Sequence, residues 1–309
     1  MKRWITILVY ALVVGVLGWF IGEKIDAFSD LYTRLNWQWA AVCFILQIPV
    51  IFFLVWPSTY LINTFGYGIK LRDIFLLSHV CNLFNNLLPY RPGIGIRWLF
   101  LKHHYNVPTK TFLLNSVCFY SLVLLIALSI FLTMGAILDI PDSYFSDAKS
   151  PYVTAILFFL GILFIFLIHK KIKSFELLTT FFSTIIKRKS CLPVFFGSIF
   201  FNIVLMGVCL YCCFLALNNP LDFSICIWLI SGIVLSSTVH VTPGNIGIAE
   251  FVVGTLTEFL IGDFNLGFAA FLLFRFTQLS AAILIGLPSI HYIINGHRGA
   301  IFQKPSIEE

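Results

Sequence analysis

Residues 74–104 read IFLLSHVCNLFNNLLPYRPGIGIRWLFLKHH, an apolar stretch that two prolines and two glycines interrupt before it becomes apolar again. A second stretch has the same design: residues 223–241 are apolar, TPGNIG at 242–247 interrupts them, and a helical pattern resumes as far as residue 261. Because proline and glycine break helices, each stretch predicts a short helix, a break and another short helix. Non-helical backbone at membrane depth is tolerated only where protein or a watery cavity satisfies its polar groups. If the chain lies in a membrane, these two stretches decide its fold.

The composition indicates that the chain does lie in a membrane. Of its 309 residues, 59% are hydrophobic and 11% are charged, and the mean hydropathy is +0.95. Soluble domains carry about 25% charged residues, and crossing the hydrocarbon takes roughly 20 apolar residues. Six stretches meet or approach that length: 4–22, 36–69, 111–138, 151–168, 191–221 and 265–290. We therefore expect an all-α polytopic membrane protein with six full transmembrane helices, two re-entrant broken-helix hairpins and a single transmembrane domain over 1–309.

The loop charges predict the orientation. Basic residues gather at 2–3, 70–72, 170–189 and 297–304, whereas the connection at 139–150 is acidic. Because basic loops stay on the cytoplasmic side, both termini are expected to be cytoplasmic in a multi-pass protein of the cytoplasmic membrane. The loops can all lie on their expected sides only if each broken stretch returns to the side of the membrane from which it entered. Residues 36–138 and 191–290 are then repeats of opposite orientation, an architecture whose binding site lies near the midplane.

Residues 169–190 have their own pattern. Apolar residues recur there at helical spacing between two basic ends. This pattern predicts an amphipathic helix lying on the cytoplasmic leaflet.

Ionisable residues inside a membrane are candidate functional residues. Arg275 lies ten residues into the last stretch, Arg91 and Arg97 flank the first break, and Glu250 and Glu258 follow the second break. One interpretation joins the three arginines in a cationic pocket for a phosphate group, because Arg matches phosphate oxygens with paired hydrogen bonds. The alternative makes Arg91, Arg97 and Lys102 anchors on the cytoplasmic side, and Arg275 a structural ion-pair partner of Glu250 or Glu258.

The breaks themselves are expected to set the backbone geometry rather than contact a ligand. Glycine adopts conformations that other residues avoid and allows close helix contact. The residues expected to form the breaks are Pro92, Gly93, Gly95, Pro243, Gly244 and Gly247.

Several function classes find no support in the sequence. The net charge of +6 sits in short patches beside apolar runs, which is typical of topology signals and not of a nucleic-acid-binding surface. No catalytic or nucleotide-binding motif is present, and the eight cysteines lie mostly in or beside apolar segments. We therefore expect no metal, no cofactor and no enzymatic activity.

Two motifs and the intramembrane arginine resemble the lysylphosphatidylglycerol synthase transmembrane-region (flippase-like) family. Residues 86–102 are similar to that family's N-L-L-P-x-R-x-G-E-x-x-R-x-x-L-L, and residues 242–250 are similar to its P-G-G-x-G-x-R-E. The family also places an Arg early in the last span, where this chain has Arg275. Two departures from the motifs remove a charge, because Ile94 replaces the family's Glu and Ala249 replaces its Arg. We hypothesise that these two family residues pair across the repeats and were lost together.

The resemblance implies a lipid-translocating module without the soluble aminoacyl-transferase domain that sometimes accompanies it. Our first interpretation is a carrier for a phosphate-containing lipid: an aminoacylated phospholipid, another anionic phospholipid or a polyprenyl-phosphate-linked sugar. The second is an accessory subunit that presents a lipid to a partner glycosyltransferase or lipid synthase. The third, an intramembrane lipid-modifying enzyme, would need Glu250 as its base.

Overall fold

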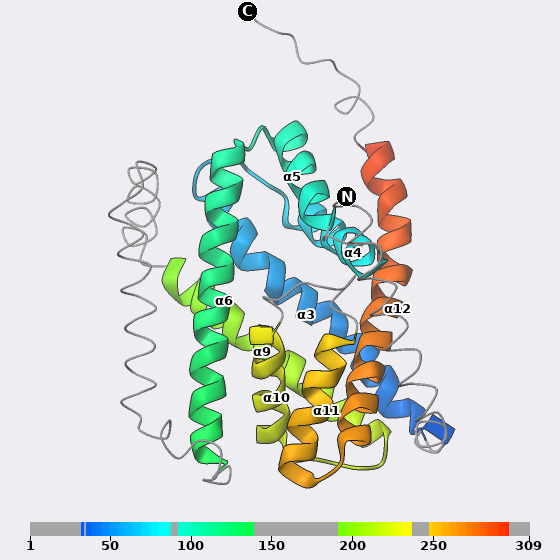
Figure 1. The fold of residues 1–309 in the computed structure, drawn as a ribbon. Coiled ribbons are helices and arrows are strands. Elements are labelled where there is room, and N and C mark those ends of the chain that lie inside the picture. Colours follow the sequence, from blue (N-terminus) through cyan, green and yellow to red (C-terminus); the bar gives the residue numbers. More distant parts are fainter. Residues whose placement is uncertain (1–31, 34, 88–91, 139–190, 237–246, 297–309) are drawn as a thin grey trace, which may run out of the picture.

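A computed structural model describes residues 32–33, 35–87, 92–138, 191–236 and 247–296. These residues form eight helices and no strand (Figure 1). The all-α class is therefore confirmed for the part of the chain that the structure describes. The spans expected at 4–22 and 151–168 and the amphipathic helix expected at 169–190 lie outside it.

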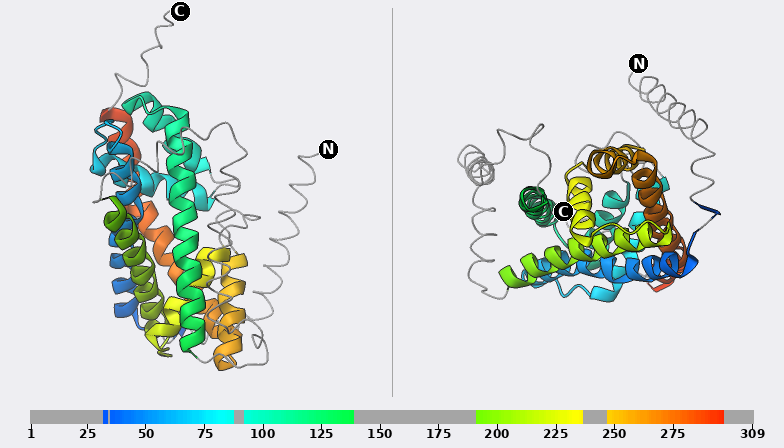
Figure 2. Two further views of the ribbon diagram at one scale, coloured as in Figure 1. Left: turned by 90° about the vertical axis from the view of Figure 1, so that its left-hand side faces the viewer. Right: turned by 90° about the horizontal axis from the view of Figure 1, so that it is seen from below.

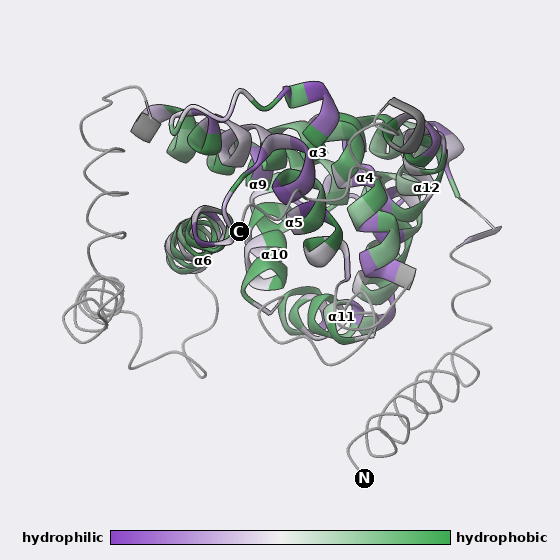
Figure 3. Ribbon diagram, turned by 90° about the horizontal axis from the view of Figure 1, so that it is seen from above, coloured by the Kyte–Doolittle hydropathy of each residue, from purple (hydrophilic) through white to green (hydrophobic). Residues whose placement is uncertain are grey.

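Four helices are long and apolar enough to cross a membrane. They are α3 (Trp37–Asn63), α6 (Thr109–Ile137), α9 (Cys191–Ala216) and α12 (Phe264–Gly296). They correspond to four of the six spans expected from the sequence. Hydrophobic residues also dominate the shorter helix α10 (Phe223–Ser236), as Figure 3 shows.

The broken stretches form two pairs of shorter helices. The first pair is α4 (Leu71–Leu87) and α5 (Pro92–Tyr105), and the second is α10 and α11 (Ile248–Ile261). Their lengths of 14 to 17 residues correspond to about 21–26 Å at the helical rise, which is less than the roughly 30 Å of hydrocarbon. Figure 1 shows the α4–α5 pair in the upper half of the bundle and the α10–α11 pair in the lower half.

The first break is shorter than the sequence suggested. Helix α5 begins at Pro92, so Gly93 and Gly95 lie inside its first turn and not in the break. Proline suits the first helical position, where its missing N–H would have no helical partner. In the second pair Gly247 lies just before α11 with a φ of 89°, in the left-handed region that favours glycine. Pro243 and Gly244 fall outside the described residues.

The two halves of the chain interlock. Helices α3 and α9 run side by side, as the right-hand view of Figure 2 shows, while α4 packs on α12 and α10 packs on α6. Small residues permit the close approaches on which membrane helix packing depends. For example, Gly286 of α12 brings its backbone against that of His79 in α4.

Gly267, where α12 packs on α11, provides a test of this packing. A methyl group on Gly267 would overlap the side chain of Thr257 and lie 2.9 Å from the carbonyl oxygen of Val253. We expect Gly267→Ala to destabilise the protein by about 1–3 kcal/mol, the usual cost of overpacking. Thermal unfolding of the purified protein in detergent measures this effect.

The matched control is Gly197→Ala in α9, where an added methyl group meets nothing within 4 Å. Because alanine favours helix, this control should leave stability unchanged or raise it by up to about 1 kcal/mol. Equal melting temperatures for the two variants would contradict the described α11–α12 contact.

Candidate functional site

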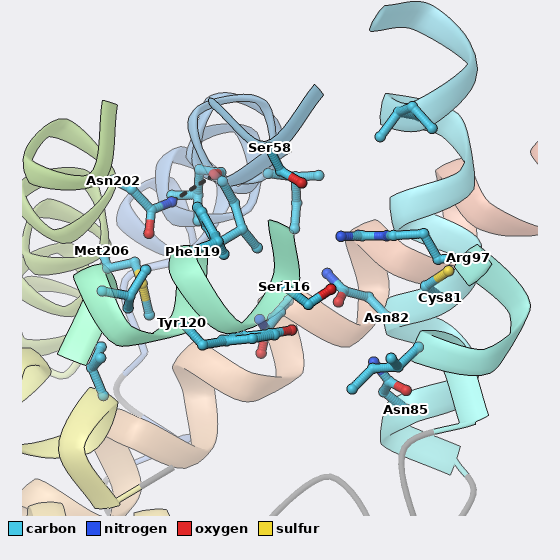
Figure 4. A pocket seen from close by; sticks show the side chains of 18 of the residues that line it. Ser58, Cys81, Asn82, Asn85, Arg97, Ser116, Phe119, Tyr120, Asn202 and Met206 are labelled. Atoms are coloured by element: carbon cyan, nitrogen blue, oxygen red, sulfur yellow. Dashed lines mark hydrogen bonds between the residues drawn. The ribbon is translucent and has the colours of Figure 1, made fainter. Parts of the chain in front are cut away.

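A cavity of about 570 Å³ lies between the two halves, and all eight described helices contribute to its lining. One part of its wall is apolar and includes residues such as Ile51, Leu54 and Phe274. The other part carries amides, hydroxyls and two arginines, and Figure 4 labels several of these residues, among them Asn82, Ser116 and Arg97. Its polar lining residues are Ser58, Thr59, Asn82, Asn85, Asn86, Arg97, Asn115, Ser116, Tyr120, Asn202, Arg275 and Gln278.

Arg97 projects from α5 toward this polar wall (Figure 4). Its Nη2 donates a hydrogen bond of 2.8 Å to the hydroxyl of Ser78, which itself donates to the carbonyl oxygen of Ile74. Within the described residues no carboxylate forms an ion pair with Arg97. The guanidinium is therefore held in place by a neutral group, and no described carboxylate compensates its charge.

Arg275 lines the same cavity from α12 and has an acidic partner. Its Nε lies 2.5 Å from Oε1 of Glu250, whose side chain is 1% exposed. The other carboxylate oxygen of Glu250 accepts a hydrogen bond of 2.7 Å from the backbone N–H of Gly247. Glu250 thus caps the start of α11 and neutralises Arg275 with a single carboxylate.

Asparagines make up much of the remaining polar wall. Asn85 accepts a hydrogen bond from the backbone N–H of Gly93, and a Cβ at Gly93 would overlap that same side chain. Asn202 donates to the carbonyl oxygen of Val50. Asn115 donates to Ser58, while its own side-chain oxygen is buried without a partner.

These amides are not among the site residues predicted from the sequence. A signal was present in α4, where Asn82, Asn85 and Asn86 recur at helical spacing in an apolar segment. Residues three and four apart share one helix face, so three amides there indicate a polar surface that needs a buried partner or a cavity.

The residues predicted from the sequence are only partly brought together. Arg97 and Arg275 both line the cavity, and Glu250 lies directly behind Arg275. Glu258 is exposed on α11 and does not line the cavity. Arg91 lies outside the described residues.

The two departures from the family motifs also lie at this site. Ile94 and Ala249 both line the cavity, Ile94 from α5 and Ala249 from α11. An isoleucine and an alanine at these places remove two charges of opposite sign from the wall.

The sequence matches a known protein family. The model described as the lysylphosphatidylglycerol synthase TM region matches residues 4–286. No curated protein matches the sequence. The family match spans both pairs of short helices and every residue that lines the cavity.

The Glu250–Arg275 pair leads to a prediction about stability. Removing one partner of a buried ion pair costs about 3–5 kcal/mol, because a charge stays buried without compensation. We expect Glu250→Gln and Arg275→Gln each to lower the melting temperature strongly, and the double variant to lose less than the sum of both. Thermal unfolding in detergent, analysed as a double-mutant cycle, gives the coupling between the two side chains.

Glu258→Gln is the control on the same helix, and its effect should stay within about 0.5 kcal/mol because the side chain is exposed. If Glu250→Gln were no more harmful than Glu258→Gln, the described ion pair would not exist in the folded protein.

Proposed function

Because the chain belongs to the lysylphosphatidylglycerol synthase transmembrane-region family, with a match over residues 4–286, we propose that it carries a phosphate-containing lipid across the cytoplasmic membrane. The family indicates a membrane lipid-related function, and the apolar helices fit a multi-pass membrane protein. Translocation, the type of lipid and the cytoplasmic position of both termini are parts of the proposal.

The observation that carries the proposal is the polar cavity inside an apolar bundle. A lipid head group has to cross hydrocarbon in which its charge is poorly solvated. The cavity offers it two arginines and several amides, while the apolar part of the wall suits the first carbons of the acyl chains. Arginines at membrane depth face a functional cavity because exposure to lipid would be costly.

The helix neighbours support alternating access between the two sides. Helices α3 to α6 correspond in order to helices α9 to α12. When each helix is replaced by its counterpart, the α4–α12 contact becomes the α10–α6 contact, and the α3–α9 contact is unchanged. Such exchange is expected of inverted repeats. We propose that these two groups of helices are such repeats and that they rock about the α3–α9 contact.

Each charged residue has a different role in this proposal. Arg97 and Arg275 hold the phosphate, and Glu250 compensates the charge of Arg275 so that the empty cavity is not strongly cationic. The head group is moved and not altered, so no covalent step is assigned to these residues.

The test measures translocation of labelled anionic phospholipids in proteoliposomes. Arg97→Gln should lower the protein-dependent rate by about tenfold or more, because a charge-assisted hydrogen bond to phosphate contributes about 1.5–3 kcal/mol. Arg97 is preferred to Arg275 because its loss does not leave a buried carboxylate unpaired. Thermal unfolding should show that the variant remains folded.

Lys102→Gln is the control, since Lys102 lies on the same helix, is exposed, and has its ammonium 5.3 Å from the centre of the Trp98 ring. It should keep the wild-type rate. Equal loss in both variants, or no protein-dependent translocation of any phosphate-containing lipid, would contradict the carrier. The second result would favour a subunit that presents lipid to a partner enzyme.

A further inference from the structure

We propose that this cavity selects a singly charged phosphodiester head group bearing uncharged hydroxyl groups, and that it discriminates against cationic head groups. This inference rests on the proposed function, because it names the class of lipid that the same site accepts. It is carried by the charges and the unpaired hydrogen-bonding groups of the cavity wall.

The first argument is the charge balance of the wall. None of the described residues that line the cavity is acidic, and the cations among them are Arg97 and Arg275. Glu250 compensates Arg275, whereas no described carboxylate compensates Arg97. The described part of the wall therefore has an excess of one positive charge, which one phosphodiester anion neutralises.

The second argument concerns the carboxylate that a cationic head group would need. Glu250 is the acidic residue beside the cavity, and both of its oxygens have partners: Nε of Arg275 and the N–H of Gly247. The Glu250 side chain is 1% exposed and lies behind Arg275, so an ammonium group in the cavity meets Arg275 before it reaches this carboxylate. A cationic aminoacyl group would then face the positive charges of Arg97 and Arg275, and like charges in a confined site disfavour binding.

The third argument is the buried acceptor on α6. The Asn115 side chain is 2% exposed, its nitrogen donates to the hydroxyl of Ser58, and its oxygen has no partner. A phosphodiester oxygen only accepts hydrogen bonds, so it cannot satisfy this oxygen. Asn115 lines the cavity, so a small rotation of its amide brings this oxygen within reach of a ligand hydroxyl, and buried acceptors need such donors.

These arguments together favour a phosphodiester whose alcohol component keeps free hydroxyls. A glycerol head group and a sugar linked through phosphate to a polyprenyl chain both have this chemistry. The two sources differ in their tails, so one assay that includes both lipids can distinguish them.

The discriminating variant is Ile94→Glu. Ile94 is 38% exposed, lines the cavity, and precedes Arg97 by three residues on α5, so the two side chains share one helix face. A carboxylate there would compensate Arg97 and give a cationic group a partner. The matched control is Ile94→Gln, which has nearly the same shape as Glu but no charge.

The experiment measures translocation in proteoliposomes of phosphatidylglycerol, lysyl-phosphatidylglycerol, phosphatidylcholine and a polyprenyl-phosphate-linked glucose, each carrying a comparable label. In the wild type, phosphatidylglycerol or the glucose lipid should move about tenfold faster than the lysyl lipid. Ile94→Glu should reduce or reverse that ratio, whereas Ile94→Gln should leave it within about twofold.

The outcomes separate this inference from the proposed function. If lysyl-phosphatidylglycerol moves as fast as phosphatidylglycerol in the wild type, or if Ile94→Glu leaves their ratio unchanged, the selectivity is refuted while the carrier stands. If no lipid is moved, the carrier is refuted, and binding of the same four lipids measured by native mass spectrometry decides the selectivity. Preferential binding of the hydroxylated phosphodiesters would support it, and equal binding would overturn it.

Discussion

The carboxylate of Glu250 connects the start of a broken helix to an intramembrane arginine, and the arrangement of the second half depends on this connection. In a bilayer, backbone groups at a helix end have no water to bind and must find partners in the protein. Glu250 accepts from the N–H of Gly247 and pairs with Arg275, so one side chain satisfies the start of α11 and a buried cation on α12. In the first half Asn85 satisfies the N–H of Gly93 near the start of α5.

These two caps explain why the polar groups converge. Helices α5 and α11 begin beside the cavity, since the side chain that caps each of them belongs to the polar wall or lies directly behind it. The long helices α3, α6, α9 and α12 supply the apolar surroundings that make such a wall costly unless it serves a ligand. The first half is capped by a neutral side chain and the second by a charged one, and among the described residues that line the cavity Arg97 is the cation without a carboxylate partner.

Much of this could be predicted from the sequence, because length and hydropathy determine which helices can span and Pro-Gly clusters mark the breaks. Arg97 and Arg275 could be predicted as lining residues, since a cation in an apolar segment has few other places to lie. The choice between Glu250 and Glu258 could not, because both lie on α11 and only tertiary packing decides which one is buried. The start of α5 at Pro92 and the role of Asn115 also depend on contacts between segments far apart in the sequence.

If the chain carries lipid as proposed, a lipid phosphate occupies the cavity between the two halves, in contact with Arg97. The most direct measurement is a cryo-electron microscopy structure of the protein in nanodiscs containing phosphatidylglycerol. The account predicts phosphate density within hydrogen-bonding distance of the Arg97 guanidinium, with the acyl chains leaving between helices into the bilayer. A cavity filled by the protein's own side chains, with lipids found only on the outer surface of the bundle, would contradict it.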